Sequence, residues 1–333
     1  MPTRMSIARL ALAFAASLMV APAGAADWTY RPHDGPTLTY TADFGLRFWY
    51  GKTTTAKNLF DPAGTQLLSR LTYGDLSIFA AEIYGRYELE KRWFLKGYVG
   101  VGTYRNGSLK DEDFGLPAPL QPYSATLSAQ SDSTPIYGSV DVGFNAIWGP
   151  DFRVGFFGGF HYMNQTISAF GCTQISFNPF ICGAFPIPNQ VRVITQNNNW
   201  YSVRLGVDAA VDFDRFRFSV DAAWVPVAWL YGSDTHWLRI GSNPGDFGGP
   251  IPEDGRGWGF QLDAFLSYRV YENLSVGVGG RYWIMQSHGF SHFENNIVNF
   301  PASPQPVDWK TQNFGVFLQA SLKLGPYSLL DVH

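Results

Sequence analysis

Regular alternation of apolar and polar residues is the feature that most constrains this chain. In the segment 199–213, every second residue from Tyr201 to Phe213 is apolar, and the residues between them are polar, charged or small. Successive side chains of a β-strand point to opposite faces, so this segment has one apolar and one polar face. The pattern returns along nearly the whole chain. In a membrane it is typical of a closed barrel with lipid outside and a polar interior.

The first residues have the pattern of a secretory signal peptide. Two arginines precede an apolar stretch at residues 10–20, and Ala-Gly-Ala at 23–25 fits a cleavage site. The apolar stretch is shorter than the ~20 residues that a spanning helix needs. We therefore expect residues 1–25 to be removed and residues 26–333 to form an outer-membrane barrel domain.

The charge and the aromatic content point to the same class. Removal of the leader leaves 22 basic and 27 acidic residues, a net charge of −5, which argues against binding to nucleic acid. Phe, Trp and Tyr make up 17% of the residues, and aromatic girdles at both bilayer interfaces would use them.

Alternation and turn residues divide the chain into ten predicted strands. They lie at about 38–51, 66–88, 93–107, 135–148, 152–168, 199–213, 215–231, 257–271, 274–290 and 311–324. Short turns follow every second strand, and long connections lie near 52–65, 108–134, 169–198, 232–256 and 291–310. A soluble β-sandwich does not explain this asymmetry. The sequence predicts an all-β, transmembrane, antiparallel up-and-down β-barrel of the bacterial outer membrane, with long extracellular loops and short periplasmic turns.

Two further groups of residues follow from this topology. The inward faces carry charged residues that we expect to pair across a filled lumen, which argues against a general porin. Cys172 and Cys182 are ten positions apart in an exported chain, so we predict a disulfide between them. His288 and His292 straddle a strand end and do not have convincing metal-ligand geometry, and Glu253-Asp254 is interpreted as a solvated turn.

Two short motifs follow the third and the seventh strands. Asp111 and Asp113 are two residues apart, as are Asp234 and His236. If both strands continue through these motifs, each pair shares one face, and the two pairs face each other across the barrel mouth. A carboxylate beside a histidine raises its basicity, so the histidine could deprotonate water. Two crowded carboxylates raise one pKa, and the protonated acid could donate to a developing oxyanion.

The ten-strand layout and these motifs resemble the omptin family of outer-membrane proteases. The resemblance implies that His236 is the general base, that Asp234 orients it, and that Asp111 and Asp113 form the facing pair on the extracellular side. It also implies that no metal, cofactor or covalent nucleophile is needed. Expected partners are outer-membrane lipid, lipopolysaccharide and a peptide or protein substrate.

The chain departs from the family pattern where basic side chains of substrates would be received. Family members that cut beside basic residues carry an acid after a Gly-Lys-Thr stretch and another two residues before the Asp of the Asp-His couple. Thr55 and Gly232 stand there in this chain. A preference for Arg or Lys is therefore not expected. A non-enzymatic barrel serving as a narrow channel, an adhesin or a structural protein stays open as the alternative.

Overall fold

The structure is a computed structural model that describes residues 40–115, 121–131 and 133–325. The expected signal peptide, residues 1–25, lies outside these ranges. Within them no helix is long and apolar enough to cross a membrane. The elements are β1 (Tyr40–Phe60), β2 (Leu67–Leu89), β3 (Trp93–Arg105), β4 (Ser108–Asp113), β5 (Ser124–Ser131), β6 (Ile136–Trp148), β7 (Phe152–Gln174), β8 (Ile187–Phe213), β9 (Phe216–His236), the 3₁₀ helix η1 (Trp237–Arg239), β10 (Ile251–Arg269), β11 (Leu274–Ser291), the 3₁₀ helix η2 (Phe293–Asn295) and β12 (Gln305–Leu324).

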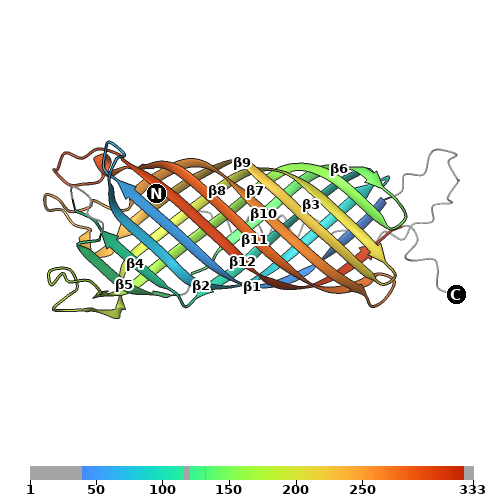
Figure 1. The fold of residues 1–333 in the computed structure, drawn as a ribbon, viewed down its shortest axis with the longest axis horizontal. Coiled ribbons are helices and arrows are strands. Elements are labelled where there is room, and N and C mark those ends of the chain that lie inside the picture. The colour runs from blue at the N-terminus through green and yellow to red at the C-terminus, as the bar shows by residue number, and fades with distance from the viewer. Residues whose placement is uncertain (1–39, 116–120, 132, 326–333) are drawn as a thin grey trace, which may run out of the picture. The chain divides into compact units, whose positions relative to one another are not determined.

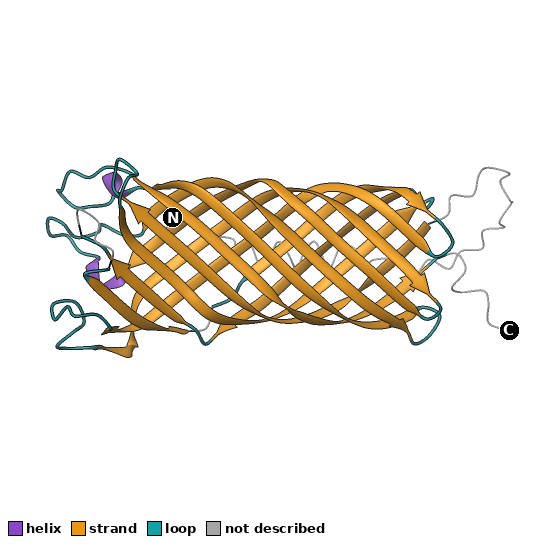
Figure 2. Ribbon diagram, viewed as in Figure 1, coloured by secondary structure: helices purple, strands orange, loops and turns teal. Residues whose placement is uncertain are grey.

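The described strands form one closed antiparallel ring (Figures 1 and 2). Closure occurs at β1, which pairs with β2 on one side and with β12 on the other. Both β3 and β4 pair with successive parts of β2, and both β5 and β6 pair with β7, so each of these couples is one interrupted strand of the ring. The twelve described strands thus occupy ten positions, and the predicted ten-stranded barrel is confirmed.

The two ends of the ring differ in their connections. At the turn end, consecutive strands are joined through the short segments 90–92, 149–151, 214–215 and 270–273. At the loop end, the connections are 61–66, 114–123, 175–186, 237–250 and 292–304. Figure 1 places β4 and β5 at the loop end, and Figure 2 shows both 3₁₀ helices there.

The outward-facing residues mark the loop-side limit of the surface that contacts lipid. Tyr50, Phe79, Trp258 and Tyr282 are exposed aromatic residues on the loop side of an apolar outer surface. Toward the loop end the outward residues become polar, as at Arg256. We call this apolar outer surface the lipid-facing band, and the strands continue well beyond it toward the loop end.

The predicted loop boundaries were therefore wrong. Segments assigned to loops, such as 52–60, 187–198 and 251–256, are strand in the structure. The reason is physical: outward apolar residues are needed only where lipid is in contact, whereas the backbone hydrogen bonds of the sheet continue into water.

Pro226 is a second correction, since the sequence suggested that it lies near the exposed end of its strand. It lies in the middle of β9, where the register with both neighbouring strands shifts. Such a bulge accommodates the missing backbone donor of a proline.

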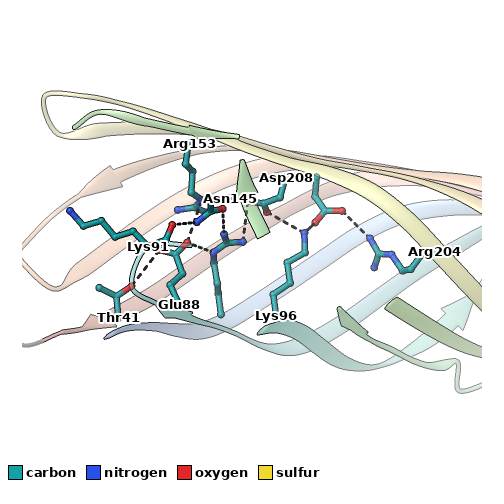
Figure 3. Close-up of polar contacts among 10 residues, drawn as sticks. Thr41, Glu88, Lys91, Lys96, Asn145, Arg153, Arg204 and Asp208 are labelled. Atoms are coloured by element: carbon teal, nitrogen blue, oxygen red, sulfur yellow. Dashed lines mark hydrogen bonds and ion pairs between the residues drawn. The ribbon is translucent and has the colours of Figure 1, made fainter. Parts of the chain in front are cut away.

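Charged side chains pair across the lumen, as predicted. Near the turn end, Lys96 donates to Asp208 at 3.1 Å and also pairs with Asp221, while Arg204 donates to Asp221 at 2.9 Å (Figure 3). These residues line a cavity of about 440 Å³. Farther along the lumen, the buried Arg281 donates to Asp263 at 2.8 Å, pairs with Glu82 and packs over the Trp283 ring.

Candidate active site

A short interruption in the barrel wall positions the first acidic motif. Between β3 and β4, Gly107 has a φ of +98°, and a Cβ there would lie 2.7 Å from the carbonyl oxygen of Gly74. Only glycine fits this conformation without strain. After it, β4 resumes pairing with β2, and Asp111 and Asp113 lie opposite Leu71 and Ser69. The condition on which the site prediction rested is met, because this motif is on a strand.

The second motif ends β9. Asp234 lies between Gln196 of β8 and Ile251 of β10, and His236 is the last residue of the strand. The side chain of Asp234 is 3% exposed and that of His236 is 23% exposed. In the order of the ring, β4 and β9 are separated by β5, β7 and β8. Both motifs lie on the loop side of the lipid-facing band.

Asp234 and His236 are in direct contact. Nε2 of His236 is 3.1 Å from Oδ2 of Asp234. An ionised carboxylate only accepts hydrogen bonds, so in the neutral form of the His236 ring Nε2 carries the proton and Nδ1 has a free lone pair. Burial alone would raise the pKa of Asp234, but His236 and Lys57 outweigh burial and hold that pKa below its usual value. Burial would lower the pKa of His236, but the Asp234 carboxylate raises it above the ordinary value.

Asp111 and Asp113 are held in a different charge state. Burial, together with the neighbouring Asp113, raises the pKa of Asp111 to about 7. Burial also raises the pKa of Asp113. His236 acts on both carboxyls in the opposite direction. The two motifs therefore belong to one electrostatic unit, in which the Asp111 carboxyl holds its proton more strongly than an ordinary aspartate does.

Lys57 and Glu253 complete this unit, although sequence reasoning did not place them there. Lys57 donates to Oδ2 of Asp234 at 2.7 Å and also pairs with Glu253. Glu253 accepts from Gln196 at 2.7 Å and from Ser291 at 3.2 Å. The alternation that continues past residue 51 puts Lys57 on the inward face, and this signal could have identified it.

The interpretation of Glu253-Asp254 as a solvated turn was wrong. Both residues lie within β10, and Glu253 is 3% exposed. Asp254 points outward and contacts Nε2 of His292 at 2.6 Å, while Nδ1 of His292 lies 2.8 Å from Glu294. Among the described residues, no cluster of three His, Cys, Asp or Glu side chains has a geometry that could hold a metal ion.

Thr55 and Gly232 stand at the two positions where acids were expected, and their surroundings differ. The Thr55 hydroxyl is buried and lies 3.0 Å from that of Thr311. A Cβ at Gly232 would lie 2.6 Å from the carbonyl oxygen of Asn197, so a side chain does not fit there. Glu253 lies directly across the ladder from Gly232. An acid is thus present at this level, but it comes from β10 and is paired with Lys57.

The connection after β9 covers one side of the site. The His236 ring packs edge-on against Phe247, with 5.5 Å between ring centroids, and Phe247 is 3% exposed. The Arg239 guanidinium lies 4.1 Å from the centroid of the same ring. At the end of β7, Cys172 and Cys182 are joined as a disulfide with a Cα–Cα distance of 5.7 Å.

Among the solved structures that the chain resembles, an outer-membrane protease shares its fold. The outer membrane protease OmpT of Escherichia coli superposes with a TM-score of 0.67 at 14% identity, covering 87% of this chain and 99% of OmpT. The translocator domain of the autotransporter NalP from Neisseria meningitidis covers 87% of this chain and 89% of its own at 9% identity, with a TM-score of only 0.34. No curated protein sequence matches.

At such low identity, the likeness to OmpT establishes a shared fold and nothing finer. The family model described as the autotransporter beta-domain matches residues 65–281, which is well over half of the chain. The protein is accordingly an outer-membrane β-barrel of bacteria, and it belongs to the autotransporter beta-domain family.

Proposed function

We propose that this barrel is a surface endopeptidase whose loop end faces the outside of the cell. The observation that carries the proposal is the contact between His236 and Asp234 in one electrostatic unit with Asp111 and Asp113. A base and a group that can retain a proton near neutral pH are the two parts that hydrolysis by activated water requires.

The proposed reaction needs only these side chains and water. The Nδ1 lone pair of His236 removes a proton from a water molecule, whose oxygen attacks the peptide carbonyl carbon. The protonated member of the Asp pair donates a hydrogen bond to the carbonyl oxygen as negative charge develops on it. When the C–N bond breaks, the protonated His236 returns its proton to the departing amine.

The surroundings of the site do not favour an Arg or Lys side chain beside the cleaved bond. Thr55 and Gly232 provide no carboxylate, and the nearby Glu253 is already paired with Lys57. We therefore propose that uncharged residues flank the cleaved bond, because a basic side chain would find no free acid at this level.

The test is cleavage of an unbiased peptide library by the refolded full chain with lipopolysaccharide supplied. We expect cleavage by the wild type and a loss of at least about a hundredfold for His236→Ala, as is typical when a general base is removed. His288→Ala is the matched control, because His288 lies on the outer surface and contacts Asp308. Absence of cleavage by the wild type, or equal activity of His236→Ala, would refute the proposal.

A non-enzymatic barrel is the second candidate, and one contact favours it. Lys57 donates to the same carboxylate oxygen that His236 contacts, which weakens the hold of Asp234 on the histidine. If the protein is a narrow channel, planar bilayers should carry a steady current that Asp111→Asn leaves unchanged. If the filled lumen seals the barrel, no current should flow.

A further inference from the structure

The connection between β7 and β8 presents an unusual surface. Phe177, Phe180 and Phe185 are 103%, 93% and 88% exposed, and Ile175 is 51% exposed. Large apolar residues this exposed and this close together mark an interaction site rather than ordinary surface. We call the segment 175–186 the Phe loop. It lies at the loop end and shares no residue with the candidate active site.

The base of the Phe loop is held in place before any partner arrives. The Cys172–Cys182 disulfide ties the loop to the end of β7. Nε2 of the Gln174 side chain donates to the carbonyl oxygen of Ile181 at 2.9 Å, and the backbone N–H of Gln174 donates to the carbonyl oxygen of Cys182 at 3.2 Å. Holding the loop in one conformation reduces the entropy lost on binding.

The absence of charge in this region indicates the chemistry of the partner. Between His161 and Arg192 the chain has no Asp, Glu, Lys, Arg or His. Charged residues make up 15% of the whole chain, so about four or five would be expected in a stretch of this length. A protein interface has a polar, often charged rim, whereas a charged side chain is costly inside a bilayer. An uncharged loop that projects phenylalanines fits lipid better than protein.

The geometry shows which lipid is within reach. The Tyr162 ring packs on that of Tyr201 at the loop-side edge of the lipid-facing band. From there β7 continues for twelve residues to Gln174, and the outward residues on the way, such as Asn164 and Thr166, are polar. At about 3.3 Å per residue and a tilt of roughly 40°, a regular strand would place Gln174 about 30 Å beyond that edge, and the register shifts between Ala169 and Cys172 make this an upper limit. The base of the Phe loop thus lies well beyond the bilayer that its own barrel spans.

We propose that the Phe loop inserts into a second, apposed lipid bilayer with a zwitterionic surface. The three phenylalanines enter the acyl region, and the disulfide and Gln174 keep them presented together. Attachment of this kind depends on apolar contact, so it is insensitive to salt. It requires no catalytic residue and stands whether or not the barrel is a peptidase.

The experiment uses the full chain in nanodiscs, mixed with phosphatidylcholine vesicles and separated by flotation. The wild type should float with the vesicles at both 0.1 M and 1 M salt. Because each buried Phe contributes a large apolar area, F177S and F180S should each weaken partitioning by about tenfold or more. F300S is the matched control, since Phe300 is 61% exposed in another connection at the same end, and it should float like the wild type.

Three outcomes would overturn the proposal. They are a wild type that stays with the unfloated fraction, F177S and F180S that float like the wild type, and a loss of flotation in F300S equal to that in F177S and F180S. If the full chain self-associated in amphipol, where no bilayer is present, and F177S and F180S each abolished this self-association, the Phe loop would be assigned to contact with a second copy instead. Far-UV circular dichroism and the gel mobility of unheated samples would verify that each variant is folded.

Discussion

Replacing Lys57 by methionine tests whether a buried ammonium group controls the basicity of His236. Nζ of Lys57 and Nε2 of His236 contact the same oxygen of Asp234 at 2.7 Å and 3.1 Å, so they lie no more than about 5.8 Å apart. Two like charges at that separation repel by about 3 kcal/mol at an effective dielectric constant of about 20. Since one pKa unit corresponds to about 1.4 kcal/mol, Lys57→Met should raise the pKa of His236 by about two units.

The assay is an NMR titration of the histidine rings in the refolded full chain, with the His236 signal assigned from its absence in His236→Ala. This readout does not depend on catalysis. Lys310→Met is the matched control, because Lys310 lies on the outward face of β12, on the opposite side of the sheet from the inward-facing Lys57. A His236 pKa that stays within about 0.3 unit of the wild type, or that falls, would refute the electrostatic account of the site. An equal shift in Lys310→Met would show that the effect is not local.

Three other predictions concern stability. Asp111 has a folded pKa of about 7, well above its unfolded value, so its ionisation destabilises the fold as the pH rises through 7. Asp111→Asn should therefore raise the apparent unfolding temperature at pH 8 by roughly 5 °C and leave it nearly unchanged at pH 3. An equal effect at both pH values would contradict this. Arg281→Met would remove the guanidinium that pairs with both Glu82 and Asp263, leaving Glu82 with Arg47 and Tyr137 alone. Urea unfolding in micelles should therefore show a loss of about 3–5 kcal/mol, and an unchanged midpoint would argue against the pairing. Gly107→Ala should cost about 1–3 kcal/mol in the same assay because of its positive φ, whereas Gly249→Ala, which meets no atom within 4 Å, should not.

The sequence could predict what depends on local periodicity. In the membrane, an inward and an outward face demand opposite residue types, so the strand that contains Tyr201 and Val207 is recognisable without a structure. The same rule placed Asp111 with Asp113 and Asp234 with His236 on common faces. The charge network of the lumen followed as well, because polar residues that face a narrow interior need partners.

The sequence could not predict where strands end in water. Beyond Tyr50 the outward residues no longer contact lipid, so Lys52 and Asn58 resemble loop residues although they continue β1. The hydrogen bonds that hold this part come from β2 and β12, and β12 is more than two hundred residues away in the chain. The same separation hid the contact of Lys57 with Asp234, although alternation alone puts Lys57 on the inward face.

The relation between Lys57 and Glu253 explains why the motifs alone underdetermine the chemistry of the site. The motifs lack two expected acids, at Thr55 and Gly232. In the structure, an acid stands across the ladder from Gly232, and a lysine two residues beyond Thr55 neutralises it. The Glu253 carboxylate, which could otherwise receive a basic side chain of a substrate, is thereby paired with Lys57, and the same lysine donates to Asp234 beside His236. Under the proposed function, the basicity of His236 and the substrate preference would thus depend on Lys57 and Glu253, two residues that no local motif contains.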